Sequence, residues 1–231
     1  MRFVKEKLRP IKHALFGKQG IHRALELVRE QRRDQGGDRV QVVFDIGAAV
    51  GDTALLIAQA FPRATLFCFE PLPESFARMR KRMSSLGDRV RCFPFGLYNR
   101  NGDITLHVAS AADSSSILPL ELAGKKYSAL GIREIGRIRL QVRTLDDVAE
   151  EIGCDVIDFM KIDVEGVERE VLEGGKHTLA RAVRNLYIEI EPLRRGVHSP
   201  DYLRVFAYLH DAGFSLVGAL DENDFFFSKL T

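Results

Sequence analysis

Short apolar segments rich in β-branched and aromatic residues recur along this chain of 231 residues, and many of them are separated by helical patterns. Turn residues bound each segment, which predicts seven strands, at 41–47, 64–71, 90–97, 158–163, 185–191, 214–220 and 224–230. Strands that alternate with helices form a parallel sheet with helices on both faces. The pattern therefore predicts an α/β domain over residues 41–231.

The segment 73–87 shows the helical pattern clearly. Its apolar residues recur at spacings of three and four, and Gly87 stands where a glycine ends a helix. We expect its basic residues on the outer face, in contact with solvent, and these are Arg78, Arg80, Lys81 and Arg82.

Residues 1–40 fall outside the alternation and form an N-terminal arm. We expect one or two helices there, broken near Pro10 and around Gly17 to Gly20. Residues 1–33 hold ten Lys or Arg and three Glu, while the whole chain has a net charge of only +2. A solvated helix explains this basic arm, and so does peripheral contact with a membrane surface, a partner or an anionic substrate.

Residues 98–145 also depart from the alternation, because two expected strands, 103–110 and 138–145, flank a long polar connection. Such a connection inside a compact domain is usually functional, so we expect this insertion to form a lid over the site. Its hydroxyl and cationic groups suit a sugar, a carboxylate or a phosphate, although solvated charges explain them equally well. They are Ser114, Ser115, Ser116, Lys125, Lys126, Arg133, Arg137, Arg139 and Arg143.

The composition, with 45% hydrophobic and 29% charged residues, is that of a globular protein. No apolar run approaches the roughly 18 residues of a membrane span, and the first residues lack a secretory core and cleavage site. Cys68, Cys92 and Cys154 lie far apart without metal-binding spacing, as is typical of reduced core residues. We therefore expect a cytoplasmic protein.

The first expected strand runs into Asp45-Ile46-Gly47-Ala48-Ala49-Val50-Gly51-Asp52, and a helical pattern follows. A glycine turn at this place lets a ligand approach the backbone closely, and Asp52 is positioned to cap the helix. Ala49 stands at the second glycine of the dinucleotide fingerprint G-x-G-x-x-G, which argues against NAD or FAD.

Glu70 and Pro71 end the second expected strand, at the distance from Gly47 where an acid accepts hydrogen bonds from a ribose diol. A ligand with a ribose and no pyrophosphate is a nucleoside compound. The negative charge of Asp45 suits a cationic one such as S-adenosylmethionine. The alternative is purely structural: a glycine turn with a capping aspartate and a surface glutamate.

A second motif, MKIDVEGVEREVLEGG at 160–175, begins in an expected strand and is dense in carboxylates. Ligands of open α/β sheets lie at the carboxyl ends of the strands, which places Asp163 in one crevice with Asp45. We expect Lys161 to form an ion pair in the wall of the sheet. The later acids should belong to the following helix and its solvent face, and these are Glu168, Glu170 and Glu173.

Together, the motifs VFDIGAAVGD, CFEP, RTLDD and above all KIDVEG-x-E resemble those of the FkbM-type S-adenosylmethionine-dependent methyltransferases. The resemblance covers residues 40–230 and implies a Rossmann-like class I fold. It implies a seven-stranded, mostly parallel sheet whose last strand runs antiparallel between the fifth and sixth. It also implies methyl transfer from S-adenosylmethionine, usually to a hydroxyl of a natural product, a glycan or a lipid-linked compound.

The resemblance also implies site residues. Those at the cofactor are Asp45, Gly47, Gly51, Asp52 and Glu70, with Pro71 beside them. Asp163 is implied at both the cofactor and the methyl-transfer end, where Glu165 joins it.

A hydroxyl acceptor must lose its proton, so a base or a metal near it would help. His198, in the loop after the fifth expected strand, is the histidine best placed as a base, although a surface histidine explains it as well. Asp163 and Glu191 offer oxygen ligands for Mg²⁺, and the sequence leaves open whether a metal is needed.

We favour an O-methyltransferase for a small molecule, a sugar or a natural product, and two alternatives remain. A nucleic-acid methyltransferase is disfavoured, because residues 163–166 read Asp-Val-Glu-Gly where base-methylating enzymes usually carry Asn/Asp-Pro-Pro-aromatic. The positive charge also lies on the arm instead of the main domain. A non-enzymatic module that binds S-adenosylmethionine and docks through the arm is the other alternative, and the intact motifs argue against it.

Overall fold

The structure is a computed structural model that describes residues 9–34, 40–110, 133–164, 166–190 and 201–229. Its elements are α2 (Arg9–Asp34), β1 (Val42–Ile46), α3 (Asp52–Ala60), β2 (Thr65–Phe69), α4 (Pro73–Met83), the 3₁₀ helix η1 (Ser84–Arg89), β3 (Val90–Phe93), β4 (Gly96–Leu97), β5 (Gly102–Ala109), β6 (Glu134–Arg143), α6 (Leu145–Ile152), β7 (Phe159–Ile162), α7 (Glu168–Glu173), α8 (Lys176–Arg181), β8 (Asn185–Glu189), α9 (Asp201–Asp211), β9 (Ser215–Ala219) and β10 (Asp224–Ser228).

Seven strands form one sheet in the order β3-β2-β1-β7-β8-β10-β9. The first five of these run parallel, and β10 runs antiparallel to β8 and to β9. This confirms the mostly parallel sheet that the resemblance implied, with the last strand between the fifth and sixth. The expected strand 90–97 is divided in two at Pro94, which has no N–H to donate to a ladder.

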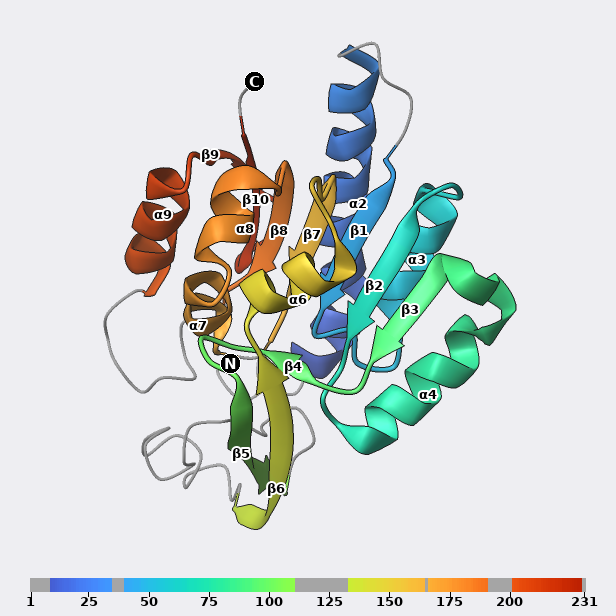
Figure 1. Cartoon of the computed structure of the whole chain (residues 1–231), viewed down its shortest axis with the longest axis vertical. Helices are drawn as coiled ribbons and strands as arrows, with labels where there is room; N and C mark the ends of the chain where they lie inside the picture. Colours follow the sequence, from blue (N-terminus) through green and yellow to red (C-terminus); the bar gives the residue numbers. More distant parts are fainter. Residues whose placement is uncertain (1–8, 35–39, 111–132, 165, 191–200, 230–231) are drawn as a thin grey trace.

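Helices cover both faces of the sheet (Figure 1). Helices α2, α3 and α4 pack on one face, and α6, α7, α8 and α9 pack on the other. Successive residues of a strand point to opposite faces, so Phe44 and Ile46 join the second layer while Val43 joins the first. Both faces of the central strands are therefore buried, as the apolar runs predicted.

The expected break around Gly17 to Gly20 is wrong, because α2 runs uninterrupted from Arg9 to Asp34. Gly20 lies where this helix crosses the sheet, and a Cβ there would collide with the carboxylate of Asp224. Close packing therefore explains this glycine. The following turns of α2 contribute four residues to the hydrophobic core, namely Ile21, Ala24, Leu25 and Val28.

The helical segment 73–87 differs from its expectation at its end. Helix α4 stops at Met83, and Gly87, with φ 58°, lies in the 3₁₀ helix η1 that follows. Met79 and Met83 are buried, as their spacing predicted. The four basic residues of α4 are exposed, as expected.

The insertion contains the two expected strands, β5 and β6, which pair antiparallel, while β4 pairs parallel with β6 in this second sheet. In Figure 1 this hairpin projects on the side where the arrowheads of β2 and β3 lie. Three of its arginines already contact carboxylates at 2.7 Å, in the pairs Arg137–Glu134, Arg139–Asp103 and Arg143–Glu151. Residues 111–132 lie outside the described residues, so the lid stays a prediction.

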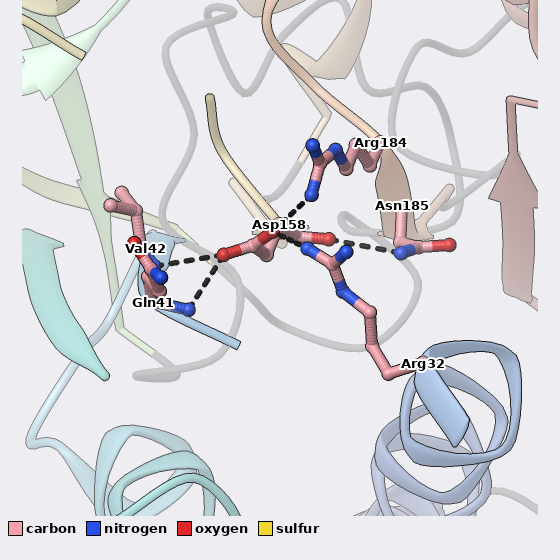
Figure 2. A network of polar contacts seen from close by, with 6 residues as sticks. All are labelled: Arg32, Gln41, Val42, Asp158, Arg184 and Asn185. Carbon is pink, nitrogen blue, oxygen red and sulfur yellow. Dashed lines mark hydrogen bonds and ion pairs between the residues drawn. The ribbon is translucent and has the colours of Figure 1, made fainter. Parts of the chain in front are cut away.

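A network of six residues ties together the amino-terminal ends of the central strands (Figure 2), and its members are Arg32, Gln41, Val42, Asp158, Arg184 and Asn185. The carboxylate of Asp158 accepts from the backbone N–H of Gln41 at 2.6 Å and of Val42 at 3.1 Å. It also accepts from Arg184 at 2.9 Å and from Arg32. Asp158 is 2% exposed, so this carboxylate joins α2, β1 and the start of β8 to β7 in a nearly dry environment.

We expect Asp158→Ala to lower the free energy of unfolding by about 3 kcal/mol, because it leaves a largely buried guanidinium and two backbone N–H groups without their acceptor. Asp158→Asn should cost less, since its amide oxygen still accepts. Urea denaturation followed by circular dichroism measures both. Asp103→Ala removes an exposed partner of Arg139 and should cost less than about 1 kcal/mol; a similar loss in all three variants would refute the role of Asp158.

Candidate functional site

The chain between β1 and α3 forms a tight turn at the carboxyl edge of the sheet. Gly47, Ala49 and Gly51 have φ values of 77°, 47° and 85°, and Ala49 is the one non-glycine with positive φ among the residues that the structure describes. The backbone N–H groups of Gly47 and Ala48 donate to the carbonyl of Phe69 at 3.1 and 3.0 Å. The turn is thereby attached to the end of β2.

The ends of β1 and β7 touch each other at this edge. A Cβ on Gly47 would collide with the carbonyl oxygen of Asp163, so any side chain there would force the two strands apart. The N–H of Asp163 donates to the carbonyl of Ile46 at 3.1 Å and extends the parallel pairing. The structure therefore brings the glycine turn and Asp163 together, as the sequence predicted.

Lys161 lies between the two aspartates of this edge. Its Nζ is 3.1 Å from Asp45 Oδ1 and 3.3 Å from Asp163 Oδ2, and it donates to the carbonyl of Gly47 at 2.8 Å. Burial alone would lower the pKa of this ammonium, but the two carboxylates outweigh burial and raise the pKa above its usual value. The predicted ion pair in the wall of the sheet is confirmed, and Lys161 carries a positive charge there.

Asp45 is completely buried beneath the glycine turn. Its contact with Lys161 is ionic, since neither carboxylate oxygen has a directed hydrogen bond within the described part of the chain. Burial raises the pKa of Asp45, and the nearby Lys161 opposes that rise. Asp45 thus affects the turn indirectly. It pairs with Lys161, and Lys161 donates a hydrogen bond to the carbonyl of Gly47.

Glu70 supports the turn from the neighbouring strand. Its Oε2 accepts from the N–H of Ala49 at 2.9 Å, and its Oε1 accepts from the N–H of Leu72 at 2.8 Å. Burial raises the pKa of Glu70, and these two hydrogen bonds oppose that rise. Each carboxylate oxygen keeps a second lone pair for a ligand hydroxyl, and half-buried Pro71 follows.

The expectation that Asp52 caps helix α3 is wrong. Gly51 is the N-cap residue, and no side chain accepts a capping hydrogen bond. Asp52 is the first residue of α3, where its carboxylate suits the helix dipole, and it pairs with Arg82 at 2.7 Å on the surface. The sequence could not distinguish these positions, because they differ by one residue of backbone geometry.

Three acids after Asp163 were expected on a solvent-exposed helix face, and one of them is buried. Glu168 does not face solvent: it is 5% exposed, and its Oε1 accepts from the N–H of Gly166 at 2.7 Å at the start of α7. Glu170 and Glu173 are partly exposed on that helix. The candidates Glu165, Glu191 and His198 lie outside the described residues.

The metal expectation finds no support. Within residues 9–34, 40–110, 133–164, 166–190 and 201–229, no group of three or more His, Cys, Asp or Glu could hold a metal ion. Asp163 belongs to the described residues and contacts Lys161, a cation already present at this carboxylate.

Tyr187, Glu189 and Asp224 form an acidic cluster that the sequence did not predict. Asp224 is the strand partner of Glu189, and its carboxylate is hydrogen-bonded to the phenol of Tyr187. Burial, and then the charge of Glu189, raises the pKa of Asp224 to about 7. Asp163 contributes in the same direction, which couples this cluster to the site electrostatically. The pairing of β8 with β10 cannot be read from sequence spacing.

We expect stability to fall as the pH rises from 5 to 8. Asp224 has a folded-state pKa of about 7 and an unfolded value of about 3.9, so the folded protein holds a proton in this window that the unfolded chain has lost. Asp224→Asn should remove about 2 kcal/mol of the pH dependence, measured by urea denaturation at both pH values. Asp211→Asn, at an exposed position, serves as control; unchanged pH dependence in Asp224→Asn would contradict the assignment.

Comparison with known proteins gives the family. Residues 45–216 match the family model described as Methyltransferase FkbM domain. The chain is similar to the 2-O-methyltransferase NoeI of Sinorhizobium fredii, with 37% identity over 155 residues that cover 64% of this chain and 62% of that protein. The matched part is therefore less than two thirds of the length of NoeI. The 31-O-demethyl-FK506 methyltransferase FkbM of Streptomyces tacrolimicus is 28% identical over 200 residues, 78% of this chain and 75% of that protein.

Two further proteins are similar to this chain, one in sequence and one in fold. The hexuronic acid methyltransferase AglP of Haloferax volcanii is 25% identical over 166 residues, which cover 72% of this chain and 61% of that protein. The solved structure of the Methanococcus jannaschii fibrillarin pre-rRNA processing protein covers 82% of this chain and 65% of its own, with a TM-score of 0.50 and 12% identity, a likeness of fold alone. The fold is the expected Rossmann-like class I fold. Because the family model spans the glycine turn, Glu70 and the KIDVEG segment, the chain belongs to the FkbM methyltransferase family.

Proposed function

We propose that this protein transfers a methyl group from S-adenosylmethionine to a hydroxyl of a small molecule, a sugar or a natural product. The observation that carries the proposal is the meeting of the glycine turn, Glu70 and Asp163 at one carboxyl edge of the sheet. The names of the relatives, a 2-O-methyltransferase and a hexuronic acid methyltransferase among them, support a hydroxyl of a sugar or natural product as acceptor.

The turn fits a nucleoside cofactor in two respects. Gly47 has no side chain between the ends of β1 and β7, and the neighbouring Ala49 is exposed with only a methyl group, so a ligand can lie against this backbone. Glu70 keeps lone pairs for a ribose diol beside the same turn. Asp45 is buried beneath the turn. Gly51 and Asp52 lie where the turn meets helix α3.

S-adenosylmethionine supplies an electrophilic methyl group, and its transfer is an in-line displacement that depends on the position of the acceptor oxygen. The acceptor hydroxyl must also give up a proton to a nearby base. We assign this role to Asp163, because its side chain is 32% exposed and Lys161 holds its Oδ2 in place. Glu165 would orient the acceptor and His198 would be a second base, and both stay proposals.

The division of the chain is also part of the proposal. The β5–β6 hairpin projects from the carboxyl edge (Figure 1), which supports a lid within 98–145 of the methyltransferase domain 41–231. The basic arm 1–40 contributes α2 to the core of that domain, so part of the arm packs as an element of the domain. Among the described helices, none has the length and apolarity to span a membrane.

We expect wild-type protein to bind S-adenosylhomocysteine saturably, and Gly47→Ala to weaken that binding at least about tenfold, since the new Cβ displaces the turn from Asp163. Isothermal titration calorimetry measures both. Gly218→Ala is the matched control, because a Cβ there meets open space. Absence of saturable binding by the wild-type protein to either S-adenosylmethionine or S-adenosylhomocysteine would refute the cofactor assignment.

For catalysis, we expect Asp163→Asn to lower turnover by about a hundredfold or more, the range of general-base effects, while affinity for S-adenosylhomocysteine changes less. Lys161 keeps Asp45 as its partner in this variant. The assay follows a labelled methyl group from S-adenosylmethionine into hydroxylated sugars and metabolite extracts, with Asp211→Asn as control. Wild-type turnover in Asp163→Asn would remove this residue from the mechanism.

A further inference from the structure

A cavity lies at the amino-terminal edge of the sheet, opposite the edge that carries the glycine turn. It has a volume of about 360 Å³, and four of the residues that line it are arginines. Arg29, Arg32 and Arg33 come from the last turns of α2, and Arg63 comes from the connection between α3 and β2. Phe61 and Val40 also line the cavity. In Figure 1 this end of α2 lies beside the start of β1, whereas the methyl-transfer edge lies at the other end of that strand.

Among the described residues that line this cavity, positive charge is in excess. Among the described residues beside it, the carboxylate of Asp158 is shared by two guanidinium groups, those of Arg32 and Arg184 (Figure 2). Arg33 and Arg63 are exposed and have no hydrogen-bond or ion-pair partner within the described part of the chain. Such a concentration of unpaired guanidinium groups favours an anionic ligand.

Arg29 and Arg32 are each held by a contact within the protein, and each keeps further N–H donors. Arg29 donates from Nη2 to the carbonyl of Ala60 at 2.8 Å, and its guanidinium lies 5.8 Å from the centre of the Phe61 ring. Arg32 is anchored to Asp158, and its side chain is only 14% exposed. A guanidinium has five N–H donors, so each of these groups can bind a ligand without leaving its anchor.

Arg32 supplies the observation that points most directly to a ligand. Its Nε is buried and has no hydrogen-bond partner within the residues that the structure describes. Burial, together with the charge of Arg184, lowers the pKa of Arg32, because the surroundings do not fully compensate its charge. A buried guanidinium whose charge is not fully compensated is unfavourable, and an anion bound in this cavity would compensate that charge.

We propose that this cavity binds the phosphate group of a phosphate ester. A phosphate offers three or more anionic oxygens that guanidinium forks bind in pairs. The volume exceeds that of the bare anion and falls within the range of about 300–1,000 Å³ that is usual for small-molecule sites. The organic part of the ester, whether a sugar, a nucleoside or a glycerol backbone, would then lie against Phe61 and Val40, which line the same cavity.

The position of the cavity decides what such a ligand does. The carboxyl edge, where methyl transfer is proposed, is at the other end of β1, so the phosphate ester is not the methyl acceptor. Helix α2 connects the two regions: its last turns line the cavity, and its Gly20 packs on Asp224 at the carboxyl end of β8. A ligand held by Arg29, Arg32 and Arg33 would fix α2 against the sheet.

Calorimetric titration of the full chain with inorganic phosphate, in a chloride buffer without S-adenosylmethionine, tests the site directly. We expect one saturable site, and a loss of affinity of about tenfold or more when Arg33 and Arg63 are both replaced by Ala, since each can contribute a charge-assisted hydrogen bond. Both residues are exposed and unpaired among the described residues, so the fold should tolerate the change. Arg78→Ala, at an exposed arginine of α4, is the matched control.

Sedimentation with vesicles distinguishes the two sources of the phosphate. Binding to phosphatidylcholine vesicles that contain phosphatidic acid, lost in the Arg33→Ala/Arg63→Ala variant, would identify a lipid headgroup. Saturable binding of inorganic phosphate without vesicle binding would identify a soluble phosphate ester. The proposal is overturned if neither is bound, or if Arg78→Ala weakens binding as much as the double variant. These results are independent of methyl transfer, because no methyl donor is present.

Discussion

A buried ammonium organises the carboxyl edge of this protein. Lys161 contacts Asp45 and Asp163 and donates to the carbonyl of Gly47, so one charge joins the end of β1, the end of β7 and the glycine turn. A charge this deep is unfavourable unless it is paired. The pairing requires that β1 and β7 be neighbours in their observed register, in which Asp45 lies opposite Lys161. The position of Asp163 at the candidate site follows from this constraint.

A second buried charge, that of Asp158, lies at the amino-terminal end of β7. Asp158 directly precedes β7 and collects donors from α2, from the start of β1 and from the residues at the start of β8. The two ends of β7 therefore hold side chains of opposite charge, the carboxylate of Asp158 at the amino-terminal edge and the ammonium of Lys161 at the carboxyl edge. Each end carries a candidate site, with a nucleoside cofactor proposed beside Lys161 and a phosphate ester proposed near Asp158.

Helix α2 gives the basic arm two structural roles. Its apolar residues enter the core beside β1 and β8, while its last arginines line the amino-edge cavity. The excess positive charge of the arm is thus partly local, gathered at one end of one helix. A solvated helix and contact with a membrane surface, a partner or an anionic substrate were the alternatives for the arm, and the four arginines that line the cavity favour an anionic ligand.

The sequence predicted the strands well because burial on both faces of a parallel sheet demands continuous apolar runs, and it predicted Lys161 as an ion pair because a cation in such a strand needs a partner. It failed where one residue of backbone geometry matters, as at Asp52, and where distance along the chain hides a contact. Glu168 was expected in solvent because its own helix looked amphipathic, but Gly166 turns back to donate to it.

By itself, then, the sequence determined the order of strands and helices, the glycine turn and the set of carboxylates at the strand ends, since these depend on local periodicity and residue type. Only the tertiary structure decided which charges share a buried environment. Asp224 meets Tyr187 and Glu189 through antiparallel pairing of β10 with β8, and Arg32 meets Asp158 although 126 positions separate them in the chain. Such contacts arise when the sheet and its covering helices close around one core, and no spacing along the chain encodes them.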